Sequence, residues 1–108
     1  MLNMFSLMKN AGKFKDVFEK IKRELPEKKV VGEAGGGMVA VQMNGKQEVL
    51  GVHIDDKIKD EEKAVLETLV ASAANQAVKK THELVKEEVK KSLGDIDMPE
   101  ISNLMNFL

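Results

Sequence analysis

The sequence predicts an α+β fold in which a helix, a three-stranded antiparallel sheet and a long helix follow one another. Apolar residues recur every three or four positions near the start and again in the second half of the chain, which is the period of an α-helix. Between these segments they alternate with polar residues, as in a half-buried strand. A chain of 108 residues has the length of one ordinary domain. We expect a single domain over residues 1–94 and a C-terminal tail over 95–108.

The first helix is expected over residues 6–25, and Pro26 ends it because proline disfavours helical geometry in the residue before it. Its apolar positions form a narrow seam of the coiled-coil kind. This seam consists of Met4, Leu7, Ala11, Phe14, Phe18, Ile21 and Leu25. A helix with so narrow a seam cannot bury itself alone, so we expect it to need a partner helix.

Three strands are expected over residues 29–33, 38–43 and 49–54. The run Gly35-Gly36-Gly37 separates the first two, and Asn44-Gly45 is a strong hairpin signal between the second and third. A four-residue loop over 44–47 would pair Val41 with Leu50. We prefer this register to that of a two-residue turn because it places apolar side chains opposite one another. The same register would pair Val39 with Val52.

The second helix is expected to begin after Asp60, a good N-cap residue, and to end at Leu93, with Gly94 after its last turn. Its first half has a broad apolar face rich in alanine, which lets another backbone approach closely. Helices longer than the sheet leave apolar seams uncovered, so we expect a homodimer. The residues expected at its interface are Val39, Val41, Leu50, Val52, Leu69, Ala73 and Ala77.

The residue types that commonly serve in catalysis or in ligand binding form no pattern here that predicts an enzyme, a cofactor site or a metal site. The chain has no cysteine. The run from Gly35 to Ala40 has the spacing G-x-G-x-x-A, but it leads into a strand, whereas a dinucleotide site needs a helix N-terminus there. His53 and His82 have no second ligand at a suitable spacing. We expect no catalytic residues, no small-molecule substrate and no cofactor.

The same absence of signals favours the cytoplasm and no membrane partner. No apolar run approaches the roughly 18 residues that a spanning helix needs. The start of the chain lacks the basic region and cleavage site of a secretory signal.

Charge is distributed unevenly along the chain. The net charge of −1 hides a net of +4 over residues 1–31 and −4 over 32–78. A lysine-rich helix face is often only a solvated surface, but two basic helices in each subunit of a dimer would suit the phosphates of a DNA duplex. The candidate DNA-binding residues are Lys9, Lys13, Lys20, Lys22, Arg23, Lys79, Lys80, Lys86, Lys90 and Lys91.

A second hypothesis is a dimeric protein-interaction module, an adaptor or holdase without affinity for nucleic acid. Phe5, Phe14 and Phe18 on the first helix motivate it, because exposed aromatic side chains would suit a hydrophobic clasp. Salt separates the two hypotheses, since phosphate contacts weaken as salt rises and an apolar clasp persists.

Three blocks of the sequence, in this order, resemble the YbaB/EbfC family of bacterial nucleoid-associated proteins. They are Gly32-Glu33-Ala34-Gly35-Gly36-Gly37, then Asn44-Gly45-Lys46 in the hairpin, then Ala73-Ala74-Asn75-Gln76-Ala77 in the second helix. The resemblance covers about residues 5–93. It implies a cytoplasmic, nucleoid-located, tweezer-shaped homodimer that binds double-stranded DNA with little or modest sequence preference. It also implies that binding alters the conformation of DNA, with roles in nucleoid organisation, gene regulation and DNA protection.

Overall fold

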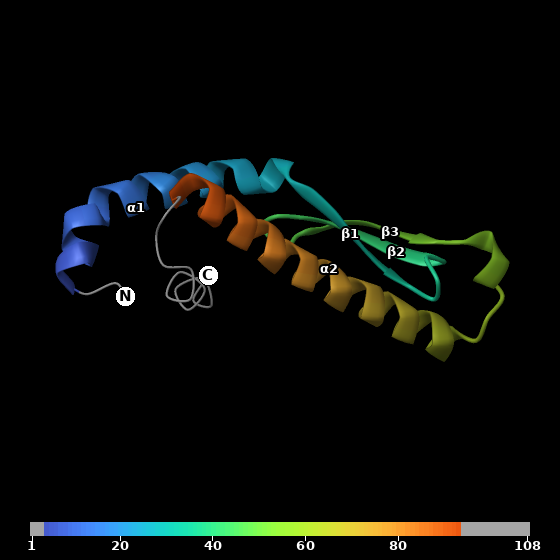
Figure 1. The fold of residues 1–108 in the computed structure, drawn as a ribbon. Coiled ribbons are helices and arrows are strands. Elements are labelled where there is room, and N and C mark those ends of the chain that lie inside the picture. The colour runs from blue at the N-terminus through green and yellow to red at the C-terminus, as the bar shows by residue number, and fades with distance from the viewer. Residues whose placement is uncertain (1–3, 94–108) are drawn as a thin grey trace. The chain divides into compact units, whose positions relative to one another are not determined.

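The computed structural model describes residues 4–93, and Figure 1 shows the order of their elements. Helix α1 precedes a three-stranded sheet, and helix α2 follows it, so the predicted α+β order is confirmed. The elements are α1 (Met4–Glu24), the 3₁₀ turn η1 (Leu25–Glu27), β1 (Lys29–Ala34), β2 (Val39–Asn44), β3 (Val49–Ile54), the 3₁₀ turn η2 (Asp56–Ile58) and α2 (Lys63–Leu93). The expected tail over 95–108 and the expected C-terminal role of Gly94 lie outside the described residues.

The chain divides into two compact units. One runs from Leu25 to Leu84 and holds the sheet and most of α2. The described part of the other consists of α1 and the last turns of α2, residues 85–93. Each unit is described separately below.

The sheet has the order β1-β2-β3 with antiparallel neighbours, and the predicted register of its hairpin is wrong by two residues. Val41 pairs with Val52 instead of Leu50, and Val39 pairs with Ile54 instead of Val52. Two separate one-residue shifts cause this difference. Because they add to two, residues 51–54 of β3 keep their predicted faces, whereas Val49 changes face.

The first shift comes from the hairpin loop, which has three residues instead of four. The Asn44 N–H donates to the Glu48 carbonyl at 3.0 Å, which closes the hairpin around residues 45–47. Gln47 adopts a positive φ of 65°, as expected for the last position of a three-residue loop. This loop alone places Met43 opposite Val49. The second shift is a bulge between Gln42 and Met43, after which Gln42 lies opposite Gly51 and Leu50 is skipped in the pairing.

The buried side chain of Asn44 holds this loop together. Its Oδ1 accepts the N–H groups of Lys46 and Glu48, both at 3.0 Å, and its Nδ2 donates to Glu48 Oε1 at 2.9 Å. The next residue, Gly45, donates its N–H to the Leu25 carbonyl at 2.9 Å, and a Cβ at Gly45 would lie only 2.8 Å from that oxygen. The loop therefore packs directly against η1.

The core of the Leu25–Leu84 unit lies between the sheet and α2, which runs along one face of it (Figure 1). Val39, Val41 and Met43 from β2 meet Ala73 and Ala77 from α2, and all five are buried. Partly buried apolar side chains surround this centre: Val30, Ala34, Ile54, Ile58, Leu69, Val70, Ala74 and Val78.

Helix α2 begins at Lys63, so the prediction that Asp60 caps it is wrong. The chain after β3 first forms η2, whose Asp55 accepts the Lys57 N–H at 2.8 Å. A further turn bond, from the Glu61 N–H to the Ile58 carbonyl at 3.1 Å, includes Asp60 within it. The first α-helical bond of α2 runs from the Leu66 N–H to the Glu62 carbonyl at 3.2 Å.

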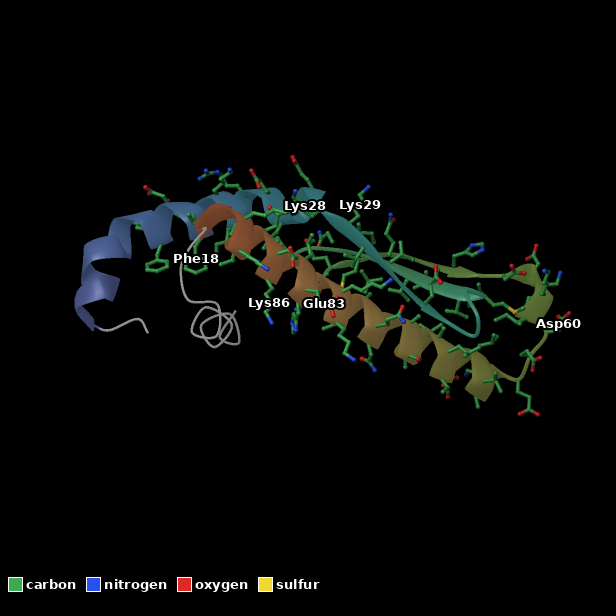
Figure 2. The ribbon with its side chains drawn as sticks, viewed as in Figure 1. Phe18, Lys28, Lys29, Asp60, Glu83 and Lys86 are labelled. Carbon is green, nitrogen blue, oxygen red and sulfur yellow. The ribbon has the colours of Figure 1, made fainter. Side chains whose placement is uncertain are left out.

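In the other unit, the apolar seam of α1 faces inward over the part described. Phe14 and Ile21 are 9% and 4% exposed, and they share a helix face because they are seven positions apart. Phe18 lies between them and is half-buried (Figure 2). Val89 of α2 is buried in the same unit. The helix continues through Gly12 without a break.

Candidate nucleic-acid interface

The basic residues near the end of α1 are exposed. Lys20, Lys22 and Arg23 all present their side chains to solvent, and the last two occupy the final turn of the helix. These basic residues lie on other faces of the helix than the buried seam, as the spacing in the sequence predicts. The side chains of Lys9 and Lys13, also predicted to bind DNA, lie outside those described.

The end of α2 adds a second set of exposed lysines. Lys86, Lys90 and Lys91 are exposed, and Lys86 is marked in Figure 2. Lys86 and Lys90 are four positions apart and therefore share one side of the helix. Exposed lysines on one helix side suit phosphate oxygens, which need a cation but no fixed orientation.

Of the two lysines predicted earlier in α2, Lys79 is exposed, whereas Lys80 already has a partner within the chain. The Lys80 Nζ donates to the backbone carbonyl of Val31 in β1 at 2.7 Å. Its ammonium group is therefore already hydrogen-bonded to the sheet, which distinguishes Lys80 from the other candidate lysines.

Acidic residues gather at the opposite end of the sheet from Lys28 and Lys29. Asp55 and Asp56 follow β3, and Asp60, Glu61 and Glu62 follow soon after. Figure 2 shows Asp60 at this end, while Lys28 and Lys29 lie where β1 begins. This acidic end would repel a phosphate backbone, so it does not belong to the candidate interface.

The residues predicted for the dimer interface separate into two groups. Val39, Val41, Ala73 and Ala77 are 0% exposed. Within one chain these four already belong to the core, and their place at a dimer interface stays a prediction. The sequence shows that a face is apolar, but it does not show whether the chain's own helix covers that face.

The remaining predicted residues belong to a surface that is not covered within the chain. Leu50 and Val52 are 46% and 49% exposed, and Leu69 is partly buried at the edge of the core. Val49, which sequence reasoning missed, is 54% exposed. The bulge at Met43 brings Val49 into line with the apolar face, and nothing in the sequence marks that bulge.

The described residues show no arrangement that suggests catalysis or metal binding. Within residues 4–93, no three His, Asp or Glu side chains gather closely enough to hold a metal ion. Every buried side-chain nitrogen or oxygen in this part of the chain has a hydrogen-bond partner. His53 and His82 are exposed. Neither described helix has a stretch that is both long and apolar enough to cross a bilayer.

The hydrophobic clasp of the second hypothesis loses one of its expected contact residues. Phe14 is 9% exposed and faces inward, and Phe18 is half-buried. The side chain of Phe5 lies outside those described.

These features define a class: a small α+β protein whose sheet is packed under one long helix and whose helix ends carry exposed lysines. The chain belongs to the YbaB/EbfC DNA-binding family, whose sequence profile it matches over residues 1–96. This is a family of DNA-binding proteins and not of enzymes.

Relatives of similar length support this assignment. The chain is 38% identical over 99 residues to a nucleoid-associated protein of Methylococcus capsulatus, covering 92% of each chain. It is 39% identical to one of Clostridium novyi, over 91% of this chain and 87% of that protein. A crystal structure of an uncharacterized protein from Helicobacter pylori has the same fold, with a TM-score of 0.64 and 26% identity, over 87% of this chain and 100% of that one.

Proposed function

We propose that this protein is a nucleoid-associated protein that binds double-stranded DNA in the cytoplasm through its phosphate backbone. The observation that carries the proposal is the match to a DNA-binding family over residues 1–96. The names of the relatives point the same way, because those of Methylococcus capsulatus and Clostridium novyi are both called nucleoid-associated proteins.

The composition of the basic helix surfaces supports binding with little sequence preference. Bases are read mainly by Arg, Asn and Gln side chains, which form paired hydrogen bonds with base edges. Residues 79–92 of α2 contain none of these three, and residues 12–24 of α1 contain one, Arg23. Lysine supplies charge without this geometry, so any preference would come from the shape of the duplex. A protein of this kind would change the conformation of DNA, and in this way organise the nucleoid, protect DNA and influence gene expression.

We further propose that the protein acts as a homodimer that joins through β3. Val49 and Val52 lie on the same sheet face as the buried Met43 and Val41, because each is the cross-strand partner of one of them. Helix α2 buries the β2 residues, yet Val49 and Val52 stay about half exposed. A second copy that covers this remainder would complete the apolar face and bring two sets of lysines to one duplex.

The DNA-binding proposal is tested by removing Lys86 and Lys90 together. We expect Lys86→Ala/Lys90→Ala to weaken binding by a similar factor on duplexes of unrelated sequence. The slope of log K against log salt should fall by about two for each chain in contact, because each lysine lost returns one counterion to the DNA. Fluorescence anisotropy with labelled duplexes across a salt series measures both quantities.

The matched control is Lys57→Ala/Lys59→Ala. These lysines are also exposed and two are again removed, but they lie in and after η2 beside the acidic end. We expect the control to keep its affinity within about twofold and its salt slope unchanged, since only lysines that touch phosphates release counterions. Equal losses in the two variants would show that total charge, and not the ends of the helices, governs binding.

A further inference from the structure

Two side chains of α2 bond to the outer edge of β1. The Glu33 N–H donates to Gln76 Oε1 at 2.6 Å, and the Lys80 Nζ donates to the Val31 carbonyl oxygen at 2.7 Å. In a strand, the N–H and C=O groups of residues two apart point to the same side. Both bonded groups therefore belong to the edge that faces away from β2, and they flank Gly32 between them.

Gln76 and Lys80 can bond to β1 because α2 crosses this strand at very short distance. A Cβ at Gly32 would collide with the Ala73 carbonyl oxygen and the Ala77 backbone nitrogen, so the two backbones touch at this point. Gln76 and Lys80 each follow one of these alanines by three positions, which turns them to one flank of the helix. The residues on the other flank, Val70, Ala74 and Val78, pack against the core.

The edge strand on the other side of the sheet differs. β3 is the last strand of the sheet, and the apolar side chains of Val49, Leu50 and Val52 are 46–54% exposed. β1 also carries an exposed apolar residue, Val31, at 40%. An exposed edge strand with apolar side chains is a template for pairing with another chain, and proteins commonly cover or interrupt such edges.

We propose that Gln76 and Lys80 close the edge of β1 against strand pairing with a second copy of this chain. An incoming strand would have to bond to the Val31 carbonyl and the Glu33 N–H, and both are already occupied from within the molecule. Lys80 is the more effective of the two, because pairing would also require its ammonium group to be displaced or buried. Association between copies is thereby directed away from β1.

The chain offers a closely matched pair of variants. Gln76→Ala/Lys80→Ala removes the closure. Asn75→Ala/Lys79→Ala removes an amide and a lysine with the same spacing, shifted by one position on the same helix and exposed to solvent. Both double variants lose the same charge and the same kinds of group, so a difference between them reports the contacts with β1.

The first measurement is hydrogen exchange at the Glu33 amide, followed by NMR. We expect this amide to be protected in the wild type and in Asn75→Ala/Lys79→Ala. In Gln76→Ala/Lys80→Ala, and in Gln76→Ala alone, it should exchange faster by on the order of tenfold, because its hydrogen bond is lost. An amide that exchanges equally fast in the wild type and in Gln76→Ala would overturn the proposal.

The second measurement is molar mass by light scattering over a range of protein concentrations. The control should have the same mass as the wild type at every concentration, whereas Gln76→Ala/Lys80→Ala should form species larger than the wild type as concentration rises. A mass that follows the wild type at all concentrations would also overturn the proposal. Because the comparison is with the wild-type mass, whatever its value, the outcome is independent of the proposed dimer and of DNA binding.

Discussion

At the scale of single residues, the fold depends on small residues that let backbones approach. Gly32 is buried in β1 directly beneath Ala73 and Ala77, and any side chain there meets helix backbone, which cannot rotate away. This contact sets the height of α2 above the sheet. It also brings Gln76 and Lys80 within bonding distance of β1.

We therefore expect Gly32→Ala to destabilise the protein by about 3 kcal/mol, since the added methyl group forces the helix away from the sheet. Urea unfolding followed by circular dichroism measures the change. Gly51→Ala is the control, because Gly51 lies in β3 with nothing within 4 Å of its added Cβ, and its cost should stay below about 1 kcal/mol. Equal unfolding midpoints for the two variants would mean that the close approach of the backbones at Gly32 contributes nothing to stability.

At the scale of elements, the sequence predicts which segments are helix or strand better than how they pair. The period of Phe14 and Ile21 predicts both α1 and its buried face. The hairpin register fails because a four-residue loop and a three-residue loop with a bulge place Val52 and Ile54 on the same face, so the alternation of apolar residues does not distinguish them. Asp60 fails as a cap because it lies in a turn that no sequence period marks.

The candidate site was predictable to a similar extent. Exposure of Lys86 and Lys90 follows from the helix period alone. The bond of Lys80 to Val31 depends on where α2 crosses β1, which is a tertiary feature. For the same reason, the sequence did not separate Val41, which the chain's own helix buries, from Val52, which stays half exposed.

The exposed surface of β3 leads to a prediction about self-association. Val52→Glu should leave the chain folded, because this side chain is 49% exposed within one chain, yet weaken the proposed dimer by about a hundredfold or more through an unpaired charge at the interface. Analytical ultracentrifugation at micromolar concentration measures the dissociation constant. His53→Glu, an exposed neighbour on the opposite face of β3, should have little effect. The interface lies elsewhere if Val52→Glu associates as tightly as the wild type.

At the scale of the whole molecule, the two structural units carry net charges of opposite sign. The described parts of the unit formed by α1 and the end of α2, residues 4–24 and 85–93, carry nine basic and five acidic residues, a net of +4. The Leu25–Leu84 unit carries eight basic and ten acidic residues, a net of −2. A polyanion would therefore be drawn to the helical unit, even though the net charge of the chain is −1.

The most direct test of DNA binding through phosphate contacts is the affinity of the wild-type protein for two duplexes of unrelated sequence, measured between about 50 and 200 mM salt. We predict that both affinities fall linearly on logarithmic axes, with the same slope and similar values at each salt concentration. An affinity that does not change with salt, or no binding to either duplex at the lowest concentration, would contradict this account.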